Sequence, residues 1–123
     1  WCGLNSCIEN FISGPAIEEE FKKINGFSLS VEEISMRDIE GEEKSKYIIN
    51  QLISRISRSL SLVINIYDPD IIVLGGGVSN IERIYEDVPK IWNQWIFSDK
   101  NFTKLKKAMH GDSSGVRGAA WLK

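Results

Sequence analysis

Cysteine and histidine are scarce in this 123-residue chain, which has two Cys and a single His. Two Cys are too few for a disulfide scaffold, which indicates a reducing cytoplasm. No apolar run reaches the length of a bilayer span, and no signal peptide opens the chain. The net charge of −2 gives no electrostatic reason to expect a nucleic-acid or anionic-membrane partner.

Apolar residues are plentiful enough for a core, because 42% of the chain is hydrophobic. The length suits a single domain over residues 1–123. In residues 43–67, apolar side chains recur at steps of three and four, which predicts a helix that is largely enclosed at its C-terminal end. Short helices are predicted over 7–13, 16–24 and 30–37, and strands over 71–74 and 103–109. A further helix is predicted to be broken near Pro89. The last helix is predicted over 114–122, where it buries Val116 and Trp121. This alternation predicts an α/β fold with few strands.

The most informative stretch is Asp70–Ser79, which reads DIIVLGGGVS. Its uninterrupted branched apolar run is typical of a strand buried on both faces of a parallel sheet. The three glycines leave the backbone without Cβ atoms, so a ligand can lie against it. Ser79 and Glu82 have the spacing of a capping box, which predicts a helix start whose N–H groups suit a phosphate. On this pattern alone two interpretations stay open: a nucleotide site, or a tight turn that binds nothing.

Two further blocks flank this stretch. The chain opens with CGLNSCIENFISGP over Cys2–Pro15 and closes with HGDSSGVRGAAWL over His110–Leu122. In this order the three blocks resemble the C-terminal part of the ROK family of sugar kinases and sugar-responsive repressors. The last block is most similar to bacterial fructokinases of the mannokinase type. The resemblance covers nearly the whole chain and favours the nucleotide site over the empty turn.

Fold and function follow from this resemblance as expectations. It implies the actin-like ATPase fold of hexokinases, which is ribonuclease H-like, with this chain as most of the C-terminal α/β half. Because the chain begins at Trp1 rather than Met, we interpret it as a fragment without its N-terminal kinase half. The parent is expected to be a fructokinase-like, ATP-dependent hexose kinase, with Mg²⁺ and the catalytic base held mainly by the absent half. The isolated chain is expected to be inactive, and a cytoplasmic homodimer is expected, with a hexose and its own N-terminal domain as partners.

The resemblance also assigns site residues by position. Gly75, Gly76 and Gly77 would approach the adenosine and phosphates of ATP. Glu9 matches a family Glu that accepts hydrogen bonds from sugar hydroxyls, a task that suits a carboxylate. Without the resemblance, Glu9 would be interpreted as a solvated helical residue. No residue of the chain is predicted to be catalytic, and His110 is interpreted as structural.

The two cysteines, Cys2 and Cys7, are separated by four residues. Their spacing alone favours two buried structural cysteines. The resemblance implies instead the last two ligands of a structural Zn²⁺ site, whose other ligands, a Cys and a His, would lie before Trp1. Zinc prefers four ligands, so this chain would hold half a site. Ser6 stands where the family usually has Gly, which alters the turn between the ligands but removes none.

The alternative function is the effector-sensing domain of a ROK-type transcriptional repressor, which would carry a DNA-binding helix-turn-helix upstream of Trp1. The intact LGGGVS run favours the kinase, since a sensor need not bind ATP. The sugar stays open among fructose, mannose, glucose and N-acetylated hexosamines.

Overall fold

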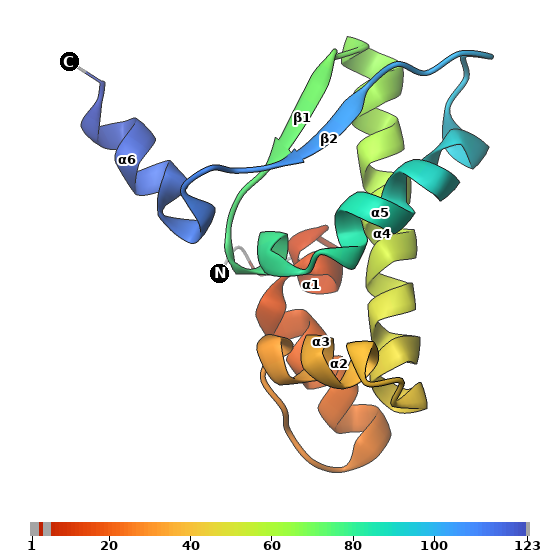
Figure 1. The fold of residues 1–123 in the computed structure, drawn as a ribbon, viewed down its shortest axis with the longest axis vertical. Helices are drawn as coiled ribbons and strands as arrows, with labels where there is room; N and C mark the ends of the chain where they lie inside the picture. Colours follow the sequence, from red (N-terminus) through yellow and green to blue (C-terminus); the bar gives the residue numbers. More distant parts are fainter. Residues whose placement is uncertain (1–2, 4–5, 123) are drawn as a thin grey trace. The chain divides into compact units, whose positions relative to one another are not determined.

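The computed structural model of the chain describes residues 3 and 6–122. Its contacts divide the chain into two compact units, Trp1–Ile56 and Ser57–Lys123. The long helix α4, Glu43–Tyr67, runs through both units (Figure 1). It confirms the helix that the apolar periodicity of residues 43–67 predicts. No helix in the described part of the chain combines the length and the apolarity that a bilayer crossing requires.

The first unit is helical. It contains α1 (Glu9–Ile12), α2 (Gly14–Asn25), α3 (Val31–Ile39) and the first part of α4. The predicted capping box of α3 is confirmed, because the Ser30 hydroxyl accepts from the Glu33 N–H and the Glu33 carboxylate accepts from the Ser30 N–H. Helix α2 begins two residues earlier than predicted, because the Ser13 hydroxyl accepts from the Ala16 N–H and proline suits a first helical turn.

The core of the first unit lies between α2, α3 and α4. Phe21 and Ile34 are fully buried, and so are Ile49 and Leu52 of α4. The remaining members of this apolar core are Ile17, Val31, Ile48, Ile53 and Ile56. These positions recur every three or four residues along their helices, so one face of each helix is buried.

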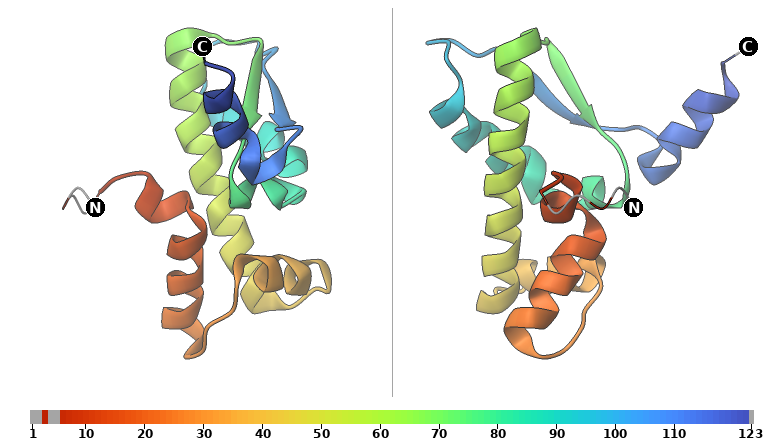
Figure 2. Two further views of the ribbon diagram at one scale, coloured as in Figure 1. Left: turned by 90° about the vertical axis from the view of Figure 1, so that its left-hand side faces the viewer. Right: turned by 180° about the vertical axis from the view of Figure 1, so that it is seen from behind.

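The second unit contains a two-stranded parallel sheet (Figure 2). Strand β1 (Ile71–Leu74) pairs with β2 (Lys104–Lys107) in the register Ile71 to Lys104. Between them lie the 3₁₀ helix η1 (Gly77–Asn80), α5 (Arg83–Ile91) and the 3₁₀ helix η2 (Trp92–Trp95). After β2 come the 3₁₀ helix η3 (Gly111–Ser113) and α6 (Ser114–Ala120). Both predicted strands are confirmed, and the break near Pro89 becomes the change from α-helix to 3₁₀ helix after Ile91.

The prediction that β1 is buried on both faces is wrong for the described chain. Ile71 and Val73 are 54% and 59% exposed, while the alternate side chains of the strand are half-buried. The reason is that the described elements cover a single face of the strand, the one on which Ile72 and Leu74 lie half-buried. The C-terminal end of α4 is likewise open rather than enclosed, with Leu62 and Ile66 exposed.

The prediction that the last helix buries its apolar residues is also wrong. Val116 and Trp121 are 76% and 85% exposed, and no described residue of α6 is buried. The physical reason is that α6 packs chiefly against the adjacent turn η3, which is too small to cover a helix face.

Candidate functional site

The glycine turn connects β1 to η1 in the second unit. Gly76 has φ 85° and ψ 172°, a backbone conformation that is open almost only to glycine. A Cβ added at Gly76 or Gly77 would meet no described atom within 4 Å. One added at Gly75 would lie 3.9 Å from the Gly111 carbonyl oxygen. The turn therefore offers bare backbone beside open space, which is what a bound nucleotide needs.

The predicted capping box at Ser79 is wrong. Ser79 lies inside η1, and its buried hydroxyl donates to the Gly76 carbonyl at 2.6 Å. Helix α5 begins only at Arg83 and has no side-chain cap. Glu82, the other half of the predicted box, pairs instead with Lys107 at 2.7 Å. The Ser79 side chain thus closes the glycine turn rather than starting a helix.

Tyr85, which sequence reasoning missed, stabilises this turn through a hydrogen bond to its backbone. The Tyr85 hydroxyl donates to the Ser79 carbonyl at 2.8 Å. Burial raises the pKa of Tyr85, so its hydroxyl stays a proton donor. This bond joins α5 to η1. Because the Ser79 hydroxyl in turn donates to the Gly76 carbonyl, the two bonds together connect α5 to the glycine turn. No sequence pattern marks Tyr85, because its partner is a backbone carbonyl.

Two of the three sequence blocks meet at this turn. Residues of η1 pack against η3, which belongs to the C-terminal block. The Ala108 N–H donates to the Leu74 carbonyl at 2.9 Å, so the chain after β2 follows the end of β1. The glycine turn therefore has the HGDSSG segment as a neighbour.

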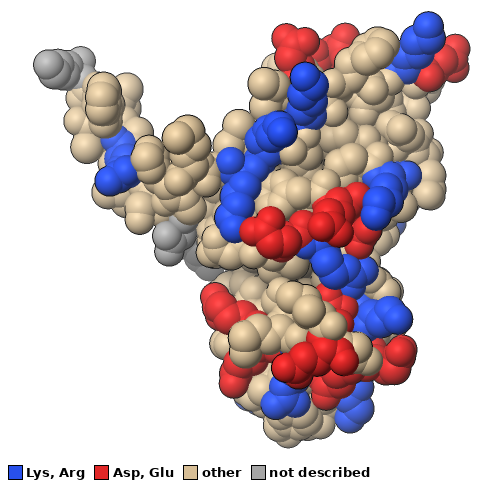
Figure 3. All heavy atoms as spheres, in the orientation of Figure 1, with Lys and Arg blue, Asp and Glu red and all other residues tan. Residues whose placement is uncertain are grey.

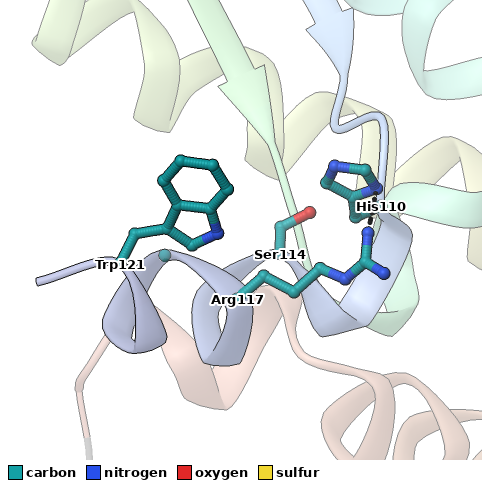
Figure 4. Close-up of a pocket in the computed structure, with 5 residues that line it drawn as sticks. His110, Ser114, Arg117 and Trp121 are labelled. Carbon is teal, nitrogen blue, oxygen red and sulfur yellow. Dashed lines mark hydrogen bonds between the residues drawn. The ribbon is translucent and has the colours of Figure 1, made fainter.

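The C-terminal block forms a shallow pocket of its own (Figure 4). Arg117 and His110 approach each other at 2.8 Å between the guanidinium and Nδ1. Since arginine is only a donor, Nδ1 is the acceptor in this contact. Ser114 and Trp121 line the remaining wall. This contact connects His110, which directly precedes η3, to Arg117 of α6.

Basic side chains gather on β2, which reads Lys-Leu-Lys-Lys. Lys104, Lys106 and Lys107 are exposed, and Figure 3 shows basic side chains in a row over the region where Figure 1 draws the sheet. Charges on a strand that has an open edge discourage pairing with other chains. The row therefore has a structural explanation and gives no support for a nucleic-acid partner.

Glu9 is the first residue of α1 in the first unit, and it is exposed. It lines an open groove together with Phe11, Ser13, Glu20 and Arg55. Arg55 donates to both carboxylate oxygens of Glu20, at 2.5 and 2.9 Å, and to the Phe11 carbonyl at 3.3 Å. The hydrogen bonds to Glu20 raise the pKa of the Arg55 guanidinium. Sequence reasoning missed Arg55, because its partner Phe11 is 44 residues away.

The predicted zinc ligands are only partly within the structure. Cys2 lies outside the described residues, and Cys7 is half-buried just before α1. Among residues 3 and 6–122, no group of three or more His, Cys, Asp or Glu side chains is arranged to hold a metal ion. The zinc site stays a prediction.

Comparison with known proteins identifies the family. The model of the ROK family matches residues 1–123. The chain belongs to the ROK family. Over 121 residues it is 37% identical to the N-acetyl-D-glucosamine kinase of Haemophilus influenzae (strain 86-028NP). The matched region covers 98% of this chain and 40% of that kinase. This chain therefore spans well under half the length of this curated relative.

Solved structures show the same fold. A ROK hexokinase from Thermus thermophilus matches with a TM-score of 0.81 and 26% identity, over 97% of this chain and 40% of that one. A ROK family transcriptional regulator, homologous to the MLC protein of E. coli, matches with a TM-score of 0.72 and 22% identity, over 86% of this chain and 30% of that one. The predicted actin-like ATPase fold is confirmed. The closer resemblance to fructokinases is not confirmed, because the relative described above is an N-acetyl-D-glucosamine kinase.

Proposed function

We propose that this chain is part of an ATP-dependent sugar kinase, and that it contributes the glycine turn of the nucleotide site and one sugar contact. The observation that carries the proposal is the turn itself: Gly76 has a backbone conformation reserved for glycine, and a Cβ at Gly76 or Gly77 would enter open space. The turn also directly follows the parallel strand β1, where backbone without Cβ atoms lets a ligand approach closely. The 37% identity to a kinase supports the same interpretation.

In this proposal the backbone at Gly75, Gly76 and Gly77 lies against the adenosine and phosphates. Phosphoryl transfer also needs a base for the attacking hydroxyl and groups that hold Mg²⁺ and the phosphates. The sequence contains no D-x-G-x-T phosphate loop, so other residues of the kinase supply these groups. Residues 1–123 alone should therefore phosphorylate no hexose. Turnover by the purified chain, free of host kinases, would contradict this division of roles.

The sugar we propose is an N-acetylated hexosamine. The described kinase relative acts, by its name, on N-acetyl-D-glucosamine. Fructose is the second candidate, because the sequence analysis predicts a resemblance of the segment His110–Leu122 to fructokinases. The test compares kcat/KM of the whole gene product for N-acetylglucosamine, glucose, mannose and fructose. We expect N-acetylglucosamine to be the best substrate, and a preference for fructose would overturn this choice.

Glu9 is the proposed sugar contact. A hydrogen bond to a charged group contributes about 1.5–3 kcal/mol, and each 1.4 kcal/mol is a tenfold change. Losing one or two such bonds in Glu9→Gln should lower kcat/KM for the sugar by roughly one to three orders of magnitude. The KM for ATP and the melting temperature should change little, since Glu9 is exposed and outside the second unit. Unchanged sugar kinetics would identify Glu9 as a solvated surface residue.

Cys2 and Cys7 are the proposed zinc ligands of this chain. Thiolates suit Zn²⁺, and such a site would fix the segment that leads into α1. Metal analysis of the whole gene product should find zinc, and Cys7→Ser should lower its content. A homodimer, a cytoplasmic location and an N-terminal partner domain stay predictions.

Catalytic turnover distinguishes a kinase from the alternative function, a transcriptional repressor. The fold does not decide, because a transcriptional regulator shares it. A kinase consumes ATP when sugar is added, whereas a sensor domain binds sugar without turnover. Sugar binding by the whole gene product with no ATP consumption would favour the repressor.

A further inference from the structure

We propose that Arg55 is a positioning residue for Glu9, and that it acts by holding the Phe11 carbonyl. The inference rests on the proposed function for its sugar readout, but its structural readout is independent of any ligand. Arg55 donates to a carbonyl of the short helix that carries Glu9, and in this way it holds that helix.

Helix α1 cannot fix Glu9 by itself. It has four residues, none of them buried, and no side-chain hydrogen bond caps its start. A single turn of helix is unstable in water, because nucleation costs more than one or two hydrogen bonds return. The direction of the Glu9 side chain must therefore depend on bonds from outside α1.

Arg55 supplies such a bond from a rigid base. It lies on α4, where Leu52 and Ile56 on either side of it are buried. Its guanidinium donates through both nitrogens to Glu20 of α2, and one of these nitrogens also donates to the carbonyl of Phe11. Phe11 is only two residues after Glu9. Arg55 thus joins α4, α2 and α1 at one planar group.

The chemistry of this contact requires arginine. A guanidinium has a rigid fork of donors that can satisfy a carboxylate bidentately and still reach a third acceptor. Glu20 holds the fork in orientation, and both side chains of the pair are less than one-third exposed. Lysine would keep the charge, but its point-like ammonium cannot reproduce the fork. Glu20 therefore orients Arg55, and Arg55 restrains the carbonyl next to the sugar contact.

The experiment uses the whole gene product and four variants. Arg55→Gln removes the fork, Arg55→Lys keeps only its charge, and Glu20→Gln weakens the ion pair but leaves Arg55 able to donate to Phe11. Lys46→Gln is the matched control, because Lys46 is on the same helix and makes an exposed ion pair with Glu43. Hydrogen exchange is measured at the amides of residues 10–13, which donate within and just after α1. Michaelis constants for sugar and ATP are measured in parallel.

Arg55→Gln should speed exchange at residues 10–13 and raise the sugar KM, each roughly tenfold, which is about 1.4 kcal/mol. The KM for ATP and kcat should stay close to wild type. Arg55→Lys should have an exchange rate and a sugar KM between those of wild type and Arg55→Gln. Glu20→Gln should lower the melting temperature and raise the sugar KM less than Arg55→Gln does. Lys46→Gln should match wild type in exchange rate and sugar KM. Exchange at residues 10–13 that is unchanged in Arg55→Gln would overturn the inference, and so would a uniform increase across the first unit.

The two proposals fail in different ways. If Glu9→Gln leaves sugar kinetics unchanged while Arg55→Gln still loosens residues 10–13, the sugar contact is refuted and the role of Arg55 in fixing α1 is supported. If Glu9→Gln impairs sugar use while Arg55→Gln changes neither exchange nor sugar KM, the positioning role is refuted.

Discussion

Substitution of neighbouring glycines can separate folding from ligand binding at the same turn. Gly76 has φ 85° and ψ 172°, and residues other than glycine held in such regions cost about 1–3 kcal/mol. A Cβ at Gly76 meets no described atom within 4 Å, so this cost is backbone strain and includes no clash with the protein. Gly76→Ala should therefore lower the free energy of unfolding by about 1–3 kcal/mol.

At Gly77, substitution is expected to affect ATP binding rather than folding stability. The φ of Gly77 is not positive, it begins η1, and a Cβ there also enters open space. Alanine at such a position adds no strain and reduces the freedom of the unfolded chain, which stabilises by about 0.4–1 kcal/mol. If ATP lies against the turn, however, the new methyl group occupies its space. Gly77→Ala should thus keep or raise stability and raise the KM for ATP by roughly tenfold, a loss of about 1.4 kcal/mol.

The assay pairs denaturant unfolding with steady-state kinetics on the whole gene product. Gly118→Ala is the control, because Gly118 also has open space at its Cβ and no positive φ, but lies in α6 outside the HGDSSG segment. The KM for sugar should not change in any of the three variants. An unchanged KM for ATP in Gly77→Ala would refute the nucleotide role of the turn, and unchanged stability in Gly76→Ala would refute the strain argument.

Local signals in the sequence predicted the elements that depend on local physics. The bounds of β1 and α4 follow from an unbroken branched run and from a long three-and-four periodicity, each ended by a change of residue type. The capping box of Ser30 and Glu33 is formed as predicted, because Ser30 has the extended backbone that directs its hydroxyl to the next turn.

The same S-x-x-E spacing failed at Ser79 and Glu82 for a tertiary reason. The glycine turn places the Gly76 carbonyl 2.6 Å from the Ser79 hydroxyl, which donates to it instead of capping a helix. Glu82 is drawn to Lys107, which is 25 residues away and reaches it only because β2 pairs beside β1. A four-residue pattern contains neither fact.

Burial and long-range polar contacts were beyond the sequence as well. The apolar run of β1 shows that the strand is suited to burial, but the exposure of Ile71 and Val73 depends on which elements cover it. Arg55 had no pattern of its own, because its partners Glu20 and Phe11 are 35 and 44 residues away. The glycine turn was predicted from its sequence motif and the family resemblance, whereas the groups that hold the site residues in position come from distant parts of the chain that no local pattern connects.

Two further predictions test the supports of the second unit. Tyr85→Phe should lower the free energy of unfolding by about 1 kcal/mol, the usual worth of one hydrogen bond, and raise the KM for ATP but not for sugar; Tyr67→Phe, at an exposed tyrosine, is the control. Asp87 is expected to stabilise the fold only above acidic pH. Hydrogen bonds from Lys90 and Arg83 lower the pKa of Asp87 below its ordinary value of 3.8. A carboxylate with a depressed pKa in the folded state contributes stability that is present above the unfolded pKa and is lost as the pH falls through the folded pKa. Wild type should therefore be more stable than Asp87→Asn near neutral pH, and the difference should shrink as the pH falls below 3.8. Comparing the two proteins cancels the acid response of other carboxylates, such as Glu33, whose pKa is lowered by the Ser30 N–H. A stability difference that persists unchanged in acid would mean that the charge of Asp87 does not stabilise α5.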